Sequence, residues 1–387
     1  MSNQGKAALC GRHAQGKILT ESVGVSVSNV EKEQRFTMCQ VADHYGFDNI
    51  ADIPRISITR AADVPVVIPS TLFTMAPIAL DQAVDQPNLH KPTKTESSTR
   101  DTGESIRLAA RTGAYDKQTS GAAPTYVQAN LIALPSRFAA DFRLLCKRNP
   151  VPCPLLAESK EVGRWDELKS WVPGVTGKEI AGDVDLRHDF PKYMVYEDGK
   201  LAQSHCRDVG SIWSEDHVGF LIGCSFSFEA ALAAEGLIPS HMAHGRNVPM
   251  YRTTLPLCPA GVFSQSTYVV SMRPFRRRDI EKVRDITRSY VATHGEPIAW
   301  GWDAATRLGI KDISKPDFGD SPILPDGSVL VQGVGDEAEE FVPVFWGCGV
   351  TPQEAVRQAA LDGPVIGHAP GHMIVLDIRD WDIVPST

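Results

Sequence analysis

The sequence of 387 residues lacks the motifs of several large enzyme classes. It has no Walker loop, no GxGxxG after a predicted strand and no GxSxG, so nucleotide, dinucleotide and serine-hydrolase chemistry lose their usual support. It has no CxxC pair, and its eight cysteines form no dense disulfide framework, which favours reduced thiols inside the cell. Two histidine pairs, His241 with His244 and His368 with His372, have no evident third ligand, so we expect no metal.

Long apolar runs are also absent. The most apolar stretch, residues 64–80, contains three prolines, so we expect no membrane-spanning helix. The net charge of −8 argues against nucleic acid or an anionic membrane as partner and favours a small molecule. No acidic residue precedes Glu21, a weak likeness to mitochondrial transit peptides. A cytoplasmic location is the simple reading, and the mitochondrial matrix is the alternative.

A change in composition divides the chain near Thr102. Residues 85–105 are rich in Pro, Ser and Thr and poor in large apolar side chains, as in a linker. We therefore expect residues 1–101 to be a poorly structured extension, and residues 102–387 to form one enzyme-like α/β unit. The sequence leaves open whether this unit forms a homodimer.

Several local patterns predict individual elements of that unit. Ser136 is a candidate cap for a helix that buries Phe142, Leu145 and Cys146. Residues 193–196 and 201–205 flank a Glu-Asp-Gly-Lys turn and predict a β-hairpin. Residues 276–293 predict a basic amphipathic helix closed by Gly295.

The clearest signal is a strand, a glycine turn and a helix within residues 342–363. Thr351 as N-cap, Pro352 at the first helical position and Glu354 three residues after the cap predict a capping box, and Gly363 is expected to end the helix. Residues 220–236 repeat the pattern more weakly, with apolar-Gly-Cys before a second helix.

The first glycine turn is a candidate carboxylate site, because a helix N-terminus presents unpaired N–H groups and a partial positive charge. Its residues are Gly347, Gly349 and Thr351, although the glycines alone are explained equally well by a tight turn. Arg273 follows a strand-like segment and Arg252 follows residues 248–251. Either can bind a carboxylate ligand or pair with a structural Asp or Glu.

Further candidates could transfer protons. Cys224 and Cys348 lie near predicted helix starts, where a thiol pKa can be lowered, although small buried cysteines are more common. Asp317 and Asp320 could divide acid and base roles, or they could simply form a turn. His294, at a predicted helix end, could transfer a proton or cap that end.

Eight blocks of the sequence, in this order, resemble the signatures of the D-glutamate cyclase family, also called hydro-lyases. Two departures are His188, where the family usually has Thr, and residues 299–300, where it usually has a second histidine after the His294 block. The second departure puts a proton-transfer role for His294 in doubt. The blocks are APTYVQANL (123–131), RNPVPCPLL (148–156), DLRHDFP (185–191), FLIGCSFSFE (220–229), NVPMY (247–251), SMRP (271–274), PDFGD (316–320) and VPVFWGCGVTPQ (342–353).

The resemblance implies a two-lobed α/β fold particular to this family, with mixed sheets and flanking helices. It also implies the dehydration of D-glutamate to 5-oxo-D-proline, a reaction that requires no organic cofactor. Placed on the matched blocks, Arg273 and residues 347–351 would hold carboxylates, Asp317 or Asp320 would act as base, and Glu229 or Cys348 as acid. Asn130, Asn247 and Arg252 complete the predicted substrate-binding set. An Arg273→Ala change should then mainly raise KM.

Two other functions fit the same residues. One is a non-catalytic binding or sensor protein for an acidic amino acid. The other is a cysteine-dependent hydrolase of lactam or amide bonds, which differs from the cyclase in requiring a reactive thiolate.

Overall fold

The structure, a computed structural model, describes residues 101–384, which all belong to one compact unit. The predicted extension lies outside the described residues apart from Asp101, so its boundary stays a prediction. Helix α2 (Gly103–Thr112) begins directly after Thr102, whose hydroxyl accepts the backbone N–H of Ser105. Within residues 101–384 no helix is long and apolar enough to cross a membrane.

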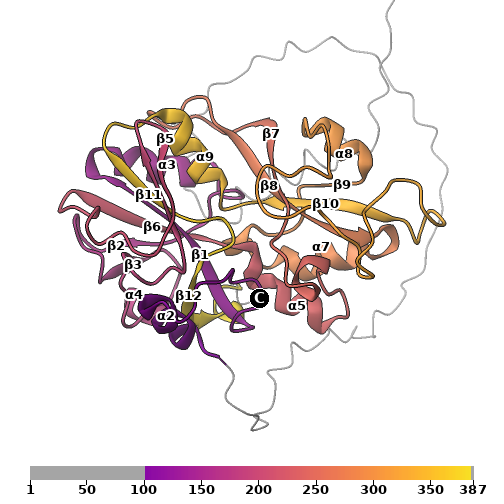
Figure 1. The fold of residues 1–387 in the computed structure, drawn as a ribbon, viewed down its shortest axis with the longest axis horizontal. Coiled ribbons are helices and arrows are strands. Elements are labelled where there is room, and N and C mark those ends of the chain that lie inside the picture. The colour runs from indigo at the N-terminus through magenta and orange to yellow at the C-terminus, as the bar shows by residue number, and fades with distance from the viewer. Residues whose placement is uncertain (1–100, 385–387) are drawn as a thin grey trace, which may run out of the picture. The chain divides into compact units, whose positions relative to one another are not determined.

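The larger of two sheets has eight strands and is organised around β1 (Tyr126–Pro135). The order is β3-β2-β6-β1-β11-β4-β5, and β12 also pairs with β1. Figure 1 shows this sheet on the left. Its other strands are β2 (Leu155–Ser159), β3 (Leu168–Ser170), β4 (Tyr193–Glu197), β5 (Lys200–Cys206), β6 (His217–Gly223), β11 (Pro364–His368) and β12 (Ile374–Arg379).

The smaller sheet, on the right of Figure 1, has the order β7-β8-β10-β9. Its strands are β7 (Met250–Pro256), β8 (Thr267–Arg276), β9 (Ala299–Trp300) and β10 (Phe341–Gly347). The longer helices are α3 (Ala139–Arg148), α7 (Ile280–Arg288) and α9 (Thr351–Ala359), and the shorter ones are α4 (Gly177–Ile180), α5 (Glu229–Ala234), α6 (Ser240–Ala243) and α8 (Trp302–Arg307). Single 3-10 turns are η1 (Ser136–Phe138), η2 (Ser225–Phe228), η3 (Arg277–Asp279), η4 (Val291–Thr293) and η5 (Asp380–Asp382).

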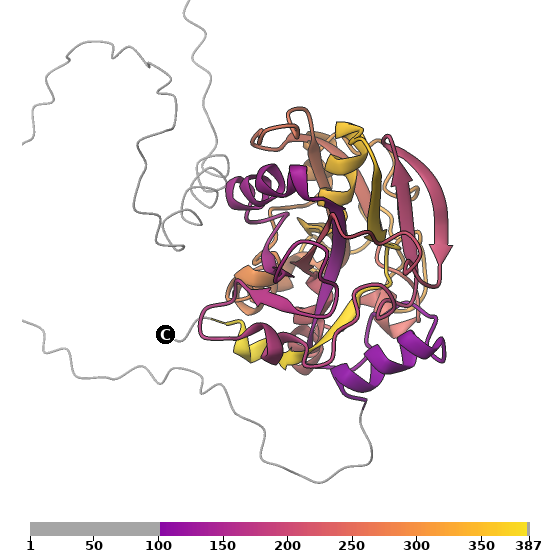
Figure 2. The same ribbon diagram turned by 90° about the vertical axis from the view of Figure 1, so that its left-hand side faces the viewer.

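The expected α/β architecture is confirmed, and every recorded strand pairing is antiparallel. Successive side chains of a strand point to opposite faces, so β1 contributes to two cores. Leu131 and Ala133 pack in one core with Ile180 of α4, whereas Ile132 and Leu134 pack in the other with α3 and α9. Figure 2 shows α3 and α9 near the top and α2 near the bottom.

The two sheets are joined by two chain crossings that run in opposite directions. Strand β6 leaves the larger sheet and leads through η2 into α5, whose Leu232 packs with Trp346 of the smaller sheet. Strand β10 leaves the smaller sheet and leads into α9, whose Val356 packs on the larger sheet. Both crossings contain a Gly-Cys pair, so the weak repeat in the sequence corresponds to two strand-turn-helix units that meet between the sheets.

Three local predictions need correction. Ser136 caps no helix, because its hydroxyl contacts Asp216 and α3 starts after η1. Thr351 is the first residue of α9 rather than its cap, because its hydroxyl is hydrogen-bonded to both backbone groups of Val269 on β8. The capping box with Glu354 is therefore absent. Helix α9 ends at Ala359, and Ala360 caps it in a left-handed conformation, so the helix stops before Gly363.

The remaining local predictions agree better with the structure. The hairpin of residues 193–205 is confirmed as β4 and β5. The basic segment 276–293 is helical only in its middle, because Arg276 is the last residue of β8 and the helix α7 ends at Arg288. Three buried residues of α7, among them Ile280 and Val283, confirm its amphipathic character.

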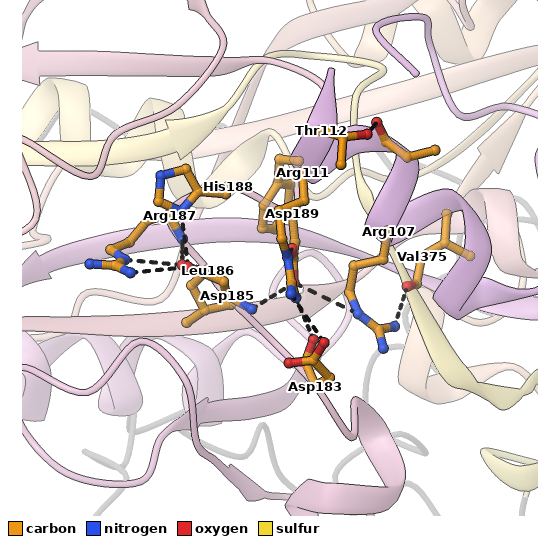
Figure 3. Close-up of polar contacts among 12 residues, drawn as sticks. Arg107, Arg111, Thr112, Asp183, Asp185, Leu186, Arg187, His188, Asp189 and Val375 are labelled. Atoms are coloured by element: carbon orange, nitrogen blue, oxygen red, sulfur yellow. Dashed lines mark hydrogen bonds and ion pairs between the residues drawn. The ribbon is translucent and has the colours of Figure 1, made fainter. Parts of the chain in front are cut away.

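A buried network of ion pairs attaches α2 to the block at residues 185–191. Asp189 accepts hydrogen bonds from Nε and Nη2 of Arg111, at 2.6 and 3.1 Å, and lies 3.7 Å from Nε of Arg107. Figure 3 shows it between the two arginines. Arg107 also binds Asp377 of β12 with both terminal nitrogens. In the same block, the ring of His188 lies 2.9 Å from the carboxylate of Asp185.

The side chain of Asp189 is fully buried, whereas that of Asp183, which also contacts Arg111, is 67% exposed. Removing one partner of a buried ion pair costs about 3–5 kcal/mol, and an exposed pair contributes at most about 1 kcal/mol. We expect Asp189→Asn to lose several times more unfolding free energy than Asp183→Asn in urea titrations. Equal losses would show that the network does not hold α2.

Candidate functional site

A small cleft lies where the two crossings meet. Its free space amounts to about 280 Å³, which includes the part open to solvent. No charged side chain is among its lining residues. They are Asn130, Cys224, Ser225, Phe226, Val248, Met250, Cys348, Gly349, Val350, His368, Gly371 and Met373.

Asn130 and Gly349 form one wall of the cleft through a close contact. A Cβ atom on Gly349 would lie 1.9 Å from Nδ2 of Asn130, so only glycine fits at this position. Both N–H groups of the Asn130 amide are used, because Nδ2 donates to the carbonyls of Ile222 and Gly223. Its Oδ1 is therefore the atom that Asn130 offers to a ligand.

Cys224 and Cys348 both line the cleft, one from each crossing. Burial raises the pKa of Cys348 to about 11, although the backbone N–H of Val350 and the charge of Arg273 act in the opposite direction. Burial also raises the pKa of Cys224, against the effect of the Phe226 N–H. A helix start was expected to favour the thiolate form, but desolvation opposes it. The side chains of Cys224 and Cys348 are therefore protonated thiols at neutral pH.

Arg273 and Glu229 lie behind the cleft and bind each other. Both are fully buried, and Nη2 of Arg273 donates to Oε1 of Glu229 at 2.6 Å. Burial by itself would raise the pKa of Glu229, but the charges of His241 and Arg273 hold it below the ordinary value. His241 Nε2 lies 3.0 Å from the same oxygen, although its direction does not suit a hydrogen bond. A carboxyl with a lowered pKa is unsuited to the acid role predicted for Glu229.

Ser225 connects this pair to the cleft. Its Oγ accepts from Nη2 of Arg273 at 3.0 Å, and Ser225 itself lines the cleft. Arg273 also donates to Ser271, and its guanidinium carbon lies 5.3 Å from the ring centres of both Phe228 and Trp346. Arg273 is thus satisfied by the protein and does not line the cleft, so its predicted contact with substrate would need a rearrangement.

Three predicted residues are near the cleft without lining it. Gly347 is the last residue of β10, and Thr351 is tied to Val269. His294 is buried in a left-handed conformation, with φ of 89°, and its Nδ1 lies 2.7 Å from the carbonyl of Val151. His294 therefore has a structural partner away from the cleft.

The loop of residues 316–320 lies outside the cleft wall formed by Val248 and Met250. Asp317 pairs with Arg252, which also contacts Glu354, and both members of the Asp317 pair are more than one-third exposed. Asp320 accepts the backbone N–H of Asn247. The Asn247 side chain packs against Gly371, which lines the cleft. The structure thus places none of these four predicted residues in the lining.

Ser225 was not among the predicted site residues, and His368 was weighed only as a possible metal ligand. Within residues 101–384 there is no group of three side chains suited to hold a metal ion. His368, the last residue of β11, is fully buried and lines the cleft, while its former partner His372 contacts the ring of His205. The position of His368 at the end of a buried strand was the signal that could have found it.

Comparison with known proteins identifies the family. The family model described as D-glutamate cyclase matches residues 218–377, which contain both crossings. A protein of Schizosaccharomyces pombe named "Putative hydro-lyase C5H10.01" is 44% identical over 272 residues, covering 70% of this chain and 83% of its own. The chain belongs to the D-glutamate cyclase family.

Bacterial relatives support the same assignment. A protein of Rubrobacter xylanophilus named "Putative hydro-lyase" is 46% identical, covering 71% of this chain and 95% of its own. The Bacillus subtilis protein named "Putative hydro-lyase YcsI" is 43% identical, covering 71% and 96%. The family resemblance of the sequence blocks is thereby confirmed. The site roles predicted from those blocks stay predictions.

The buried pair of Arg273 and Glu229 predicts a large effect on stability. Arg273→Ala would leave the buried Glu229 carboxylate without its arginine, beside His241 and the Ser120 hydroxyl, so we expect a loss of about 3–5 kcal/mol of unfolding free energy. Arg307→Ala, which removes an exposed arginine from its pair with exposed Asp303, should cost at most about 1 kcal/mol. Urea unfolding of both variants measures the difference. A folded Arg273→Ala protein of normal stability with raised KM would instead restore Arg273 as a direct substrate ligand.

Buried His294 predicts acid sensitivity. Burial lowers its pKa to about 4, against the effect of the Val151 carbonyl, whereas the unfolded chain titrates near 6.5. The unfolded state therefore binds more protons below pH 6.5, and the stability that His294 contributes above this pH is lost as the pH falls toward 4. Between pH 7 and 5 we expect His294→Gln to lose about 2 kcal/mol less unfolding free energy than the wild type. Exposed His244→Gln is the control and should follow the wild type.

Proposed function

We propose that this hydro-lyase family member dehydrates D-glutamate and closes it to 5-oxo-D-proline. The observation that carries the proposal is the small cleft of uncharged polar groups and protonated thiols between the two crossings of a D-glutamate cyclase family chain.

The chemistry requires a balanced transfer of two protons. The amine nitrogen bonds to the γ-carboxyl carbon, one carbon-oxygen bond breaks, and both protons lost by the original ammonium group leave with that oxygen as water. A group that gives one proton to the oxygen and takes one from the nitrogen ends the reaction unchanged. Cys348 suits this role, since a thiol whose burial raises the pKa to about 11 is protonated at neutral pH and strongly basic once it has donated.

Other lining groups hold the substrate. The start of α9 at Gly349 offers a backbone N–H group and a helix dipole to the α-carboxylate. Asn130 Oδ1 accepts a hydrogen bond from the amine, which directs the nitrogen toward the carboxyl group. Ser225 lines the cleft and accepts a hydrogen bond from Arg273, so its hydroxyl can face the substrate while the guanidinium itself stays out of contact.

The uncharged lining also favours the reactive form of the amine. An ammonium ion transferred into a cleft without a carboxylate loses hydration without gaining an ion pair, so the neutral amine is favoured. Asp317 and Asp320 lie outside the lining, and we do not carry their predicted base role forward. The first ammonium proton then passes to the γ-carboxylate of the same substrate, which loses hydration in the same cleft, and Cys348 carries the second proton, so that both leave with the oxygen as water.

The test is proton NMR of the full chain with D-glutamate, L-glutamate or 5-oxo-D-proline, with and without a chelator. We expect 5-oxoproline to form from D-glutamate and not from its enantiomer, at a rate that the chelator leaves unchanged. Cys348→Ser should lower kcat by about 100- to 10,000-fold, because a hydroxyl is a weaker proton donor. Cys258→Ser, at an exposed cysteine, is the matched control.

The same experiment separates the other two functions. Ligand-induced shifts without turnover would favour a binding protein for an acidic amino acid. Hydrolysis of lactams or amides unrelated to glutamate, abolished by thiol alkylation at neutral pH, would favour a cysteine hydrolase. Burial of both lining thiols argues against that last outcome.

A further inference from the structure

His368 is held in one orientation by the residues around its Nδ1 atom. Nε2 of Gln353 lies 2.8 Å from Nδ1 and donates to the carbonyl of His368 at 2.6 Å. The amide cannot be reversed, because its oxygen would then face that carbonyl oxygen. The backbone N–H of Leu131 also points at Nδ1, at 3.3 Å, and lies closer than the Leu131 carbonyl, which is at 3.5 Å. Nδ1 is therefore a hydrogen-bond acceptor, and the ring proton is on Nε2.

Among residues 101–384, the Nε2–H group of His368 has no hydrogen-bond partner. The atom is buried without a hydrogen bond, and the ring belongs to the cleft lining. Burial lowers the pKa of His368 to about 3, with His372 adding a repulsion and the Leu131 carbonyl acting in the opposite direction. The ring is thus neutral throughout the physiological range, and a buried donor without an acceptor requires an explanation.

The other polar groups of the cleft indicate which acceptor this donor meets. The start of α9 serves the α-carboxylate, and Asn130 Oδ1 is an acceptor that suits the amine. The group still without a partner is the carboxyl at which the ring closes, whose oxygen gains negative charge as nitrogen attacks. A neutral, fixed N–H stabilises that charge without giving up its proton.

We propose that His368 donates its Nε2–H to an oxygen of the γ-carboxyl group, the lactam carbonyl in the product, and that Gln353 is a positioning residue that fixes the tautomer. This assignment rests on the proposed function. Nothing in the family match assigns a role to either residue.

The kinetic test compares two replacements of His368. The amide N–H of Gln lies near the place of Nε2, whereas that of Asn lies near the place of Nδ1. We expect His368→Asn to lower kcat for D-glutamate on the order of 100-fold with little change in KM, and His368→Gln to recover at least tenfold of that loss. Exposed His244→Gln should match the wild type. A raised KM with unchanged kcat in His368→Asn, or equal losses in both His368 variants, overturns the assignment.

A spectroscopic readout separates this inference from the proposed reaction. In the full chain labelled with ¹⁵N-histidine, we expect the wild-type His368 signals to show the neutral Nε2–H tautomer from pH 5.5 to 9, and the Nε2–H proton to shift when 5-oxo-D-proline is added. Gln353→Glu places a carboxylate beside Nδ1 and should move the proton there or create the imidazolium.

The outcomes of the two experiments are distinct. A ligand-induced shift of the Nε2–H signal in a protein that does not turn over D-glutamate retains the donor and rejects the reaction. Turnover that is unaffected in His368→Asn rejects the donor and retains the reaction. A wild-type signal from the Nδ1–H tautomer overturns the roles of both His368 and Gln353.

Discussion

The buried contact between Arg273 and Glu229 is the interaction on which the rest of the site depends. Glu229 is the first residue of α5, which the crossing from the larger sheet delivers, and Arg273 is in the middle of β8 in the smaller sheet. Neither charge could be buried alone without a large desolvation cost. The pair therefore fixes where the first crossing enters the smaller sheet, and through Ser225 it fixes one wall of the cleft.

The second crossing is fixed without charge. The hydroxyl of Thr351 is bound to both backbone groups of Val269, so the first turn of α9 is attached to β8 just as the first crossing is. Arg273 and Glu229 pair with each other, and Arg252 pairs with Asp317 and Glu354. The polar groups that face the cleft are therefore uncharged. A charged ligand must then be recognised by oriented N–H and carbonyl groups, which discriminate by direction more than by charge.

The sequence predicted those parts of the fold that depend on neighbours along the chain. The β4 and β5 hairpin, and the two strand-turn-helix units with Cys224 and Cys348, follow from short patterns that tertiary packing leaves intact. The cap at Thr351 failed because Val269, 82 residues away, competes for the same hydroxyl. The sequence also could not show that Arg273 pairs with Glu229, because the two residues are 44 positions apart and only tertiary packing brings them together. Until then, each is an equally good candidate to bind a ligand.

The two thiols show how the environment can reverse a local expectation. A helix start lowers a thiol pKa by the field of a few peptide groups, and the N–H of Val350 acts in this way on Cys348. Complete burial acts in the opposite direction and is the larger effect, so the same residue changes from a candidate nucleophile into a candidate proton carrier. A reaction that moves protons from nitrogen to oxygen without net charge transfer is compatible with such a site. A reaction that needs a cysteine thiolate in the resting enzyme does not fit this site, because none of the described residues that line the cleft carries the positive charge that would stabilise a thiolate.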